Sequence, residues 1–335
     1  MIKKILSVTV ILIFLGLGIY VLFQPKIVQF SNKNPIPSPE PEKPIKLVFT
    51  GDIMLDRGVA YQVQKQGNND FAFPFLKIAD YLKTVDLVFG NLESQISDKG
   101  TKIGSIYSFR ADPKAIEGLE FAGFEVLSLA NNHAFDYGPL ALQDSMERLI
   151  KAGISPLGAG TENQAFAPVI KTINGSASSP PVRIAFFAYS EGPETWQATK
   201  DDIGIAIVSD KTIERIKQDI DLAKQLADIV IVSLHAGNEY DENPSQSQID
   251  FSHAFIDAGA DLVVGHHPHI VQKSEIYLGK HIFYSLGNFV FDQGFSPETM
   301  AGGVLEVEIK DKKISKTSLK TIKINEFFQP QALEL

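Results

Sequence analysis

The chain has 335 residues, of which 44% are hydrophobic and 21% charged, enough for one large or two medium globular domains with a sizeable core. Its net charge of −9 argues against a nucleic-acid partner, because proteins that bind nucleic acids usually present a basic face. There is no cysteine, which excludes disulfides, thiolate metal sites, cysteine nucleophiles and lipid-modified cysteine. Any metal must therefore be bound by histidine, carboxylate or amide groups.

The N-terminal segment 5–23 is an uncharged apolar run. A helix of this length spans roughly the 30 Å hydrocarbon core of a bilayer, so we predict a single-pass transmembrane anchor. A cleaved signal peptide is the main alternative and a buried soluble helix the other, but no small-residue cleavage site follows the run. Lys3 and Lys4 precede it and Lys26 follows it. This bias predicts a cell-membrane protein with its body outside the cytoplasm.

Residues 24–44 form the predicted linker, because 31–44 read SNKNPIPSPEPEKP. A proline-rich segment with few apolar residues gives a semi-rigid spacer and not a fold. The sequence therefore predicts a globular domain over 45–325 and a short tail over 326–335.

Short apolar runs alternate with amphipathic segments along this domain. Most of the runs are continuous β-branched or aromatic stretches, which is typical of strands buried on both faces. The alternation predicts an α/β fold in layers. The expected strands are 45–51, 86–90, 124–130, 182–190, 228–235, 261–265 and 281–289, with a hairpin over 302–324 turning near Asp311. The expected helices are 140–153, 210–227 and 245–259.

Polar side chains follow five of these strands at the point where each strand ends. In an open α/β sheet, ligands bind beyond the carboxyl ends of the strands, so these residues should gather at one edge. Carboxylates, imidazoles and an amide oxygen suit Zn²⁺, Mn²⁺ or Fe. The residues are Asp52; Asn91 and Glu93; Asn131, Asn132, His133 and Asp136; His235 and Glu239; and His266, His267 and His269.

Each of these pieces also has a plain structural interpretation. The segment GHHPH, 265–269, could be a polar loop, and NNH, 131–133, could cap a helix. A lone histidine such as His235 is often a hydrogen-bonded core residue. If every plain interpretation were right, all five groups would have reached the same edge by accident. A shared metal site explains their common position better. We interpret His253 and His281, in a helix and a strand, as structural.

The successive motifs resemble those of the bacterial poly-gamma-glutamate capsule biosynthesis (CapA-type) family. They cover about residues 45–295 and read TGDIMLDR, FGNLES, FRADP, LANNHAFDYG, LGAG, SLHAGNEY, GADLVVGHHPHIVQ and YSLGNFVFD. That family resembles the calcineurin-like metallophosphoesterases. The resemblance therefore implies a two-sheet β-sandwich flanked by helices.

The resemblance also implies residue roles. His133 is the candidate general acid, with Asp136 and Arg110 as further catalytic candidates. Arg57 and Arg110 could reach an anion, although either could equally be a surface arginine. The implied metal ligands are Asp52, Glu93, Asn132, His235, His267 and His269, with Asn91 as the alternative to Glu93. The implied supporting residues are Asn91, Glu239, His266 and Arg57.

Two positions depart from the phosphoesterase pattern. Met54 stands where that superfamily usually has a histidine, and Gly90 is followed by Asn91 instead of aspartate, with Glu93 further on. One metal position therefore loses a nitrogen ligand. We expect one firmly bound divalent metal, with a weaker second.

Three functions remain in competition at this point. The first is a membrane-anchored factor for synthesis or export of an anionic polymer, by resemblance poly-gamma-glutamate, acting with a membrane-bound synthase complex. The second is a metal-dependent phosphoester hydrolase at the cell surface, in which a metal-bound water supplies hydroxide and His133 protonates the leaving oxygen. The third is a non-catalytic binder with a structural metal.

Overall fold

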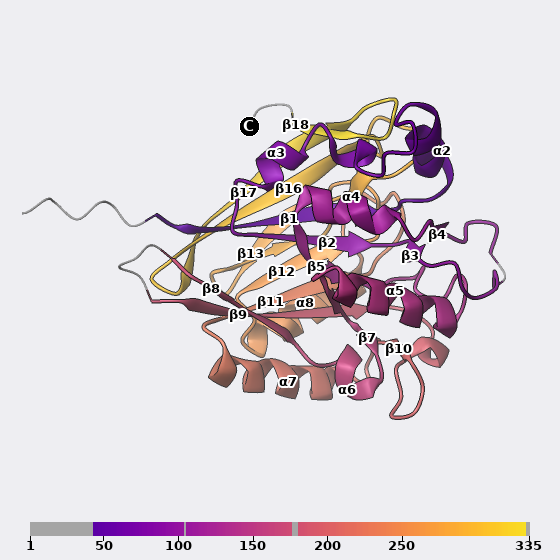
Figure 1. Ribbon diagram of the computed structural model, residues 1–335. Helices are drawn as coiled ribbons and strands as arrows, with labels where there is room; N and C mark the ends of the chain where they lie inside the picture. The colour runs from indigo at the N-terminus through magenta and orange to yellow at the C-terminus, as the bar shows by residue number, and fades with distance from the viewer. Residues whose placement is uncertain (1–42, 104, 176–179, 333–335) are drawn as a thin grey trace, which may run out of the picture. The chain divides into compact units, whose positions relative to one another are not determined.

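The computed structural model describes residues 43–103, 105–175 and 180–332. The predicted anchor, 5–23, and nearly all of the predicted linker lie outside the described residues. Within the described part of the chain, no helix is long and apolar enough to cross a membrane. The body that follows is built around two large β-sheets (Figure 1).

The first sheet has eight strands in the order β18-β17-β16-β1-β2-β5-β6, and β15 pairs with the end of β1. Strands β1, β2, β5 and β6 run parallel, whereas β16 pairs antiparallel with β1. The bounds are β1 Ile45–Ile53, β2 Leu87–Leu92, β5 Phe124–Ser128, β6 Ser155–Leu157, β15 Asn288–Val290, β16 Ala301–Lys310, β17 Lys313–Ile324 and β18 Pro330–Ala332.

The second sheet has six strands in the order β13-β14-β12-β11-β9-β8. Its centre is parallel and its two edges are antiparallel. The bounds are β8 Val169–Ile173, β9 Val182–Ser190, β11 Ile229–His235, β12 Leu262–His266, β13 Ser274–Tyr277 and β14 Lys280–Phe283. Two small ladders pair β3 Gln95–Ile96 with β4 Arg110–Ala111 and β7 Ala159–Gly160 with β10 Gly204–Ile205.

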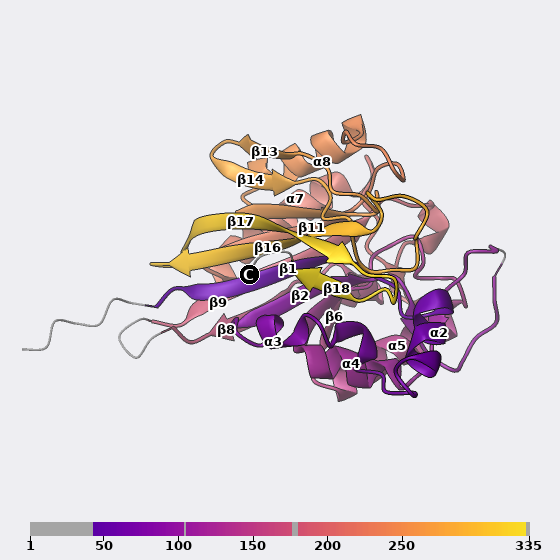
Figure 2. The same cartoon turned by 90° about the horizontal axis from the view of Figure 1, so that it is seen from above.

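The sheets pack face to face, and helices cover their outer faces (Figure 2). Two neighbouring side chains on β9 point to opposite faces of the second sheet. Phe186 packs between the sheets, where its ring centroid lies 6.3 Å from that of Phe49 on β1. Phe187 packs against the helices on the outer face. The strands are therefore buried on both faces, as their apolar runs predict. The helices are α2 Arg57–Lys65, α3 Ala79–Leu82, α4 Ala115–Ala122, α5 Pro139–Lys151, α6 Glu162–Ala165, α7 Ile213–Leu226 and α8 Gln246–Asp257, with 3₁₀ turns at Phe73–Phe75 and Glu194–Trp196.

The predicted α/β architecture is confirmed, with one strand prediction that was wrong. The expected strand 281–289 is two strands in different sheets, because the chain leaves the second sheet after β14 and joins the first as β15. Gly287 allows this crossing, since its φ of 67° lies in the left-handed region.

At the C-terminus the predicted hairpin forms as β16 and β17. Its two loop residues, Asp311 and Lys312, both have positive φ, which matches the twist of the flanking strands. Part of the expected tail, 326–335, adds strand β18 to the sheet.

Candidate metal centre

The ends of four strands from both sheets bring the predicted residues together. In the first sheet, Asp52 on β1 is the register partner of Asn91 on β2, and Glu93 follows β2. In the second sheet, His235 on β11 is the register partner of His266 on β12. Because both sheets end at the same side of the sandwich, carboxylates from one sheet face imidazoles from the other.

Asp52, Glu93 and His235 form the centre of this cluster. Each is buried and offers one ligand atom, and these atoms all lie within 4.8 Å of one another. His235 Nδ1 is 3.7 Å from Glu93 Oε1, and its Nε2 is 3.0 Å from Asn132 Oδ1. The predicted amide ligand therefore lies beside the predicted isolated histidine.

A second group of imidazoles surrounds the other side of Asp52. His266 Nδ1 is 3.2 Å from Asp52 Oδ1, and His269 Nδ1 is 3.5 Å from Asp52 Oδ2. His267 bridges the two groups, since its ring centroid is 4.8 Å from that of His235 and 6.1 Å from that of His269. All six predicted metal ligands are thus brought to one place.

Several of these buried atoms have no partner in hydrogen-bond geometry among the described residues, although His266 Nδ1 contacts Asp52. They are Glu93 Oε2, His267 Nδ1 and both ring nitrogens of His266. An unpaired buried polar atom costs free energy, and native structures satisfy nearly all of them. A divalent cation would satisfy these atoms at once, so the residues present fit the group that the donor set implies.

Asn91 lies in the middle of the cluster. Its Nδ2 is 2.9 Å from Asp52 Oδ1, 3.3 Å from Glu93 Oε1 and 3.2 Å from His235 Nδ1. The Asn131 side chain in turn donates to Asn91 Oδ1 at 3.3 Å. Rotation of the Asn91 amide would present its oxygen to the same centre, so it is placed to bind metal as well as to support the ligands.

Burial lowers the pKa of His235, His267 and His269 and so favours the neutral imidazole, which is the form that binds metal. Desolvation, followed by the neighbouring histidines, lowers the pKa of His235 well below its ordinary value. Burial and His269 lower the pKa of His267 to about 4.

The two central carboxylates are shifted in opposite directions. Burial, and then the charge of Asp52, raises the pKa of Glu93 well above its ordinary value. For Asp52, burial is outweighed by His266, His269 and Asn91, which together lower its pKa. A bound cation would favour the ionised form of both groups.

Beside the cluster, His133 is oriented by a carboxylate. Its Nδ1 is 2.7 Å from Asp136 Oδ2, an oxygen that also accepts from the Phe109 backbone N–H at 2.7 Å. With Nδ1 held in this way, Nε2 faces the cluster and lies 4.0 Å from Glu93 Oε2. This pairing fixes which ring nitrogen can exchange a proton at the centre.

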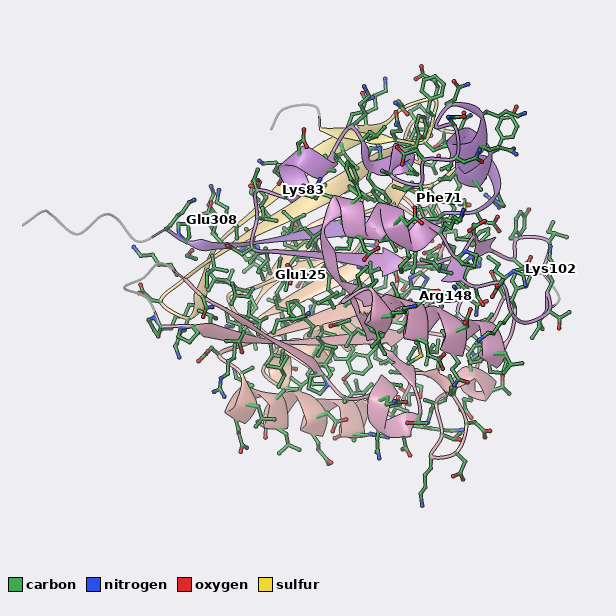
Figure 3. The ribbon with its side chains drawn as sticks, viewed as in Figure 1. Phe71, Lys83, Lys102, Glu125, Arg148 and Glu308 are labelled. Carbon is green, nitrogen blue, oxygen red and sulfur yellow. The ribbon has the colours of Figure 1, made fainter. Side chains whose placement is uncertain are left out.

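A cavity of about 700 Å³ opens in front of the cluster. One wall is the loop between β3 and β4, which carries Lys102 and extends from this end of the sheets (Figure 3). The cavity's polar lining includes the exposed Glu239. Its aromatic lining residues are Tyr107, Phe109, Phe135, Trp196, Tyr240 and Phe295.

Comparison with known proteins shows the family to which the chain belongs. Residues 46–293 match the family described as bacterial capsule synthesis protein PGA_cap. The chain belongs to this family. A capsule biosynthesis protein CapA of Bacillus anthracis is 34% identical over 83% of this chain and 66% of its own length. A PGA biosynthesis protein CapA of Bacillus subtilis is 32% identical over 83% of this chain and 71% of its own length.

Among solved structures, a phosphatase of Mycoplasma pneumoniae is similar, with a TM-score of 0.52. It is 18% identical, and the match covers 84% of this chain and 95% of that one. At this identity the likeness shows the fold alone. It agrees with the metallophosphoesterase-like sandwich that the PGA_cap motifs imply.

The two predicted arginines differ in their surroundings. Arg57 lines the cavity, but its guanidinium is paired with Asp292 and stacks 4.7 Å from the centroid of Phe109. Arg110 is not among the residues that line the cavity. Its side chain donates to the Lys99 carbonyl at 3.0 Å and lies over Tyr137. Its catalytic role stays a prediction.

The backbone around the last two histidines is not extended. In an extended segment, His267 and His269 would point to the same side because they are two residues apart. Strand β12 instead ends at His266, and the φ angles of His267 and His269 are 101° and 59°, in the left-handed region. Such backbone is strained for a residue other than glycine, and strain of this kind is concentrated at functional sites.

Met54 is fully buried in the core, and its sulfur accepts from the Asp56 backbone N–H at 3.1 Å. Its position supplies no ligand. His266, predicted only as a supporting residue, instead places its imidazole against Asp52, with Nδ1 3.2 Å from Oδ1 and Nε2 without a partner among the described residues. His253, interpreted as structural, is 3.1 Å from Glu275 and stacks on Tyr277.

Sequence reasoning missed Asn288 on β15. This buried side chain accepts from His269 Nδ1–H through its Oδ1 at 3.0 Å, while its Nδ2 donates to the Thr299 carbonyl, so the imidazole carries its proton on Nδ1 and Nε2 is left free. The motif YSLGNFVFD contains Asn288, and this was the one signal that could have found it.

Proposed function

We propose that this protein takes part in the synthesis or export of an anionic extracellular polymer, poly-gamma-glutamate, through a divalent metal centre at the strand ends. The membership in the capsule synthesis family carries the proposal, since relatives over most of the chain are named for capsule and PGA biosynthesis. The predicted anchor, 5–23, would hold the body outside the cytoplasm beside a membrane-bound synthase complex.

The metal centre is the part of the proposal that the geometry supports. A divalent ion there would supply a Lewis acid and an activated water. The chain's own residues would orient the bound group: Asn288 fixes the tautomer of His269, and Asp136 fixes that of His133. Aromatic walls would limit access of water to the cavity.

Metal content tests this centre. The variant His267→Ala should lose most of its bound metal, measured by elemental analysis, because an unpaired imidazole between the two ligand groups is removed. The matched variant His253→Ala removes an imidazole from α8 and should retain the metal. Equal metal content in the two variants would contradict a site at the strand ends.

Polymer production tests the cellular role. Cells of the native host that carry His267→Ala should produce less surface poly-gamma-glutamate than cells with His253→Ala, at equal protein level. If the purified His267→Ala variant lacks metal but the cells produce an unchanged amount of surface poly-gamma-glutamate, the metal is not needed for polymer production.

The second candidate is a metal-dependent phosphoester hydrolase at the cell surface. The observation that favours it is the His133–Asp136 pair, whose free Nε2 faces both the cluster and the cavity. His133 would protonate the leaving oxygen. In a phosphodiester screen of the metal-loaded protein, His133→Gln should then lower turnover about 100-fold while metal content stays constant. Absence of any turnover in the unmodified protein would remove this candidate.

A further inference from the structure

A lysine-lined groove lies at the end of the molecule opposite to the metal centre. It encloses about 510 Å³ between the second sheet, α7 and the β16–β17 hairpin. Ile229, which lines it, begins strand β11, and His235 of the metal centre ends the same strand. At about 3.3 Å per residue the two sites are roughly 20 Å apart.

The groove is positively charged in a chain whose net charge is −9. Five lysines and two aspartates line it, which leaves an excess of three positive charges. The lysines are Lys224, Lys280, Lys312, Lys313 and Lys316.

Both aspartates have structural partners that account for them. Asp228 accepts from the Arg183 backbone N–H at 2.8 Å and pairs with Lys312 at 3.0 Å. Asp261 accepts from the Val230 backbone N–H at 3.0 Å and pairs with Lys280.

The other three lysines remain to face the groove. Lys224 and Lys313 have no carboxylate within ion-pair distance among the described residues, and Lys316 Nζ is 3.7 Å from Glu308. All three side chains belong to exposed residues. Lys224 and Lys313 are therefore available to a ligand, and the exposed Lys316 can exchange its long contact with Glu308 for a ligand carboxylate.

The cavity at the metal centre has the opposite character. Arg57 is its one arginine, already paired with Asp292, while Asp136 and Glu239 add further carboxylates. The carboxylates of this cavity would repel an extended polyanion, and only a bound metal would attract it there. The groove is where an anionic chain would gain electrostatic free energy.

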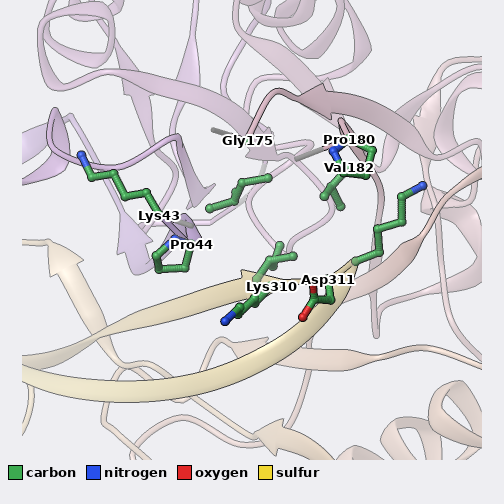
Figure 4. Close-up of a pocket in the computed structure, with 10 residues that line it drawn as sticks. Lys43, Pro44, Gly175, Pro180, Val182, Lys310 and Asp311 are labelled. Atoms are coloured by element: carbon green, nitrogen blue, oxygen red, sulfur yellow. The ribbon is translucent and has the colours of Figure 1, made fainter. Parts of the chain in front are cut away.

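The tip of the hairpin extends this basic region. A smaller cavity of about 190 Å³ lies on its other side and is lined by Lys43, Lys310 and Lys312 (Figure 4). Lys312 lines both cavities. The hairpin thus presents lysines to two adjoining hollows at one end of the body.

From this charge pattern we infer that the lysine-lined groove binds a segment of a carboxylate-rich polymer, separately from the metal centre. The inference rests on the proposed function and adds a second polymer-binding site to it. Lysine ammonium groups on flexible stems bind carboxylates without the fixed fork geometry of arginine, which suits a chain that moves along the groove. The volume accommodates a short segment and not a folded partner.

The test measures binding of fluorescent poly-gamma-glutamate to the full-length chain in uncharged phosphatidylcholine nanodiscs. The groove variant combines Lys224→Gln, Lys313→Gln and Lys316→Gln. Its affinity should fall at least about tenfold at low salt, because each exposed ion pair contributes roughly a factor of two to five. The charge-matched control variant combines Lys114→Gln, Lys151→Gln and Lys200→Gln, which are exposed lysines away from the groove, and should change less than about twofold.

Each outcome distinguishes the two proposals. Equal polymer affinity of groove and control variants overturns the groove inference alone. No polymer binding by the unmodified chain overturns the groove and counts against the proposed function as well. If hydrogen exchange of 312–317 slows on adding phosphatidylglycerol vesicles but not on adding polymer, the groove is a membrane contact and the inference is wrong.

Discussion

At the scale of single residues, His266 lowers the stability of the metal-free protein at a position where its imidazole can bind the metal. Its Nε2 is buried without a partner among the described residues, its Nδ1 contacts Asp52 Oδ1 at 3.2 Å, and the residue has no exposed surface. In the metal-free protein this arrangement costs free energy, because Nε2 has left water without gaining a hydrogen bond. A ligand role explains why a histidine occupies the position.

The first prediction replaces His266 by leucine. In metal-free protein, His266→Leu should raise the free energy of unfolding by about 1 kcal/mol, because removal of the unsatisfied Nε2 at similar volume outweighs the lost contact of Nδ1 with Asp52. The same variant should bind less metal. Denaturant unfolding and elemental analysis measure the two effects. A variant that is less stable without metal and still binds the full amount would contradict a ligand role.

The second prediction concerns pH. The pKa of His267 is about 4 in the folded protein and 6.5 ordinarily, so below pH 6.5 the unfolded chain takes up a proton that the folded chain does not. Stability of the metal-free protein should therefore fall as pH decreases from about 6.5 to about 4, by roughly 3 kcal/mol for this group.

Urea unfolding across that pH range measures the loss. In His267→Gln the decrease should be smaller by the contribution of this one group, since glutamine does not titrate. An equal pH dependence of stability in the unmodified protein and in His267→Gln would show that the imidazole of His267 takes up its proton in the fold as it does in the unfolded chain.

At the scale of elements, the position of β1 depends on a close approach of backbones. A Cβ added at Gly51 would lie 1.9 Å from the Gly287 carbonyl oxygen, at the crossing between β14 and β15. Asp52 follows directly, and its backbone N–H donates to the same carbonyl at 2.9 Å. Glycine at this position thus lets the strand carrying the central carboxylate meet the strand carrying Asn288.

The third prediction follows from this contact. Gly51→Ala should destabilise the protein by about 3 kcal/mol or more, because backbone and not a flexible side chain must move. It should also lower metal affinity through displacement of Asp52. Gly294→Ala is the control, since an added Cβ there has no atom within 4 Å. Similar melting temperatures for both variants would contradict the close approach.

At the scale of the whole molecule, the two ends of the strands carry different charged groups. One end carries the carboxylates, imidazoles and aromatic cavity, and the other carries the lysine-lined groove. The sandwich separates them by about the length of β11. An anionic polymer could therefore be held at one end and meet a metal at the other.

The fourth prediction concerns the segment before the body. We expect 5–23 to remain attached as an anchor with the body outside, because the apolar run is uninterrupted and lacks a cleavage site. Protease added to intact cells should degrade the body. A body that resists protease until lysis would reverse the orientation, and a mature chain beginning after residue 25 would indicate a cleaved signal peptide.

The sequence by itself determined the α/β fold class and predicted that the polar residues after the strands gather at one edge. Continuous apolar runs can be buried only between two layers, and polar residues placed at the ends of parallel strands must meet at one edge. This is why Asp52, Glu93 and His235 were expected to lie together, their roles as ligands being implied by the family resemblance, and why the hairpin around Asp311 was predicted correctly.

The tertiary structure decided what depends on contacts between segments distant in sequence. No periodicity within 281–289 shows that the chain changes sheets at Gly287, because that choice depends on the space beside Gly51. Nor does local pattern show that His266, rather than position 54, places an imidazole beside Asp52. Only the packing of the two sheets brings the end of β12 against the end of β1, and this packing completes the metal centre.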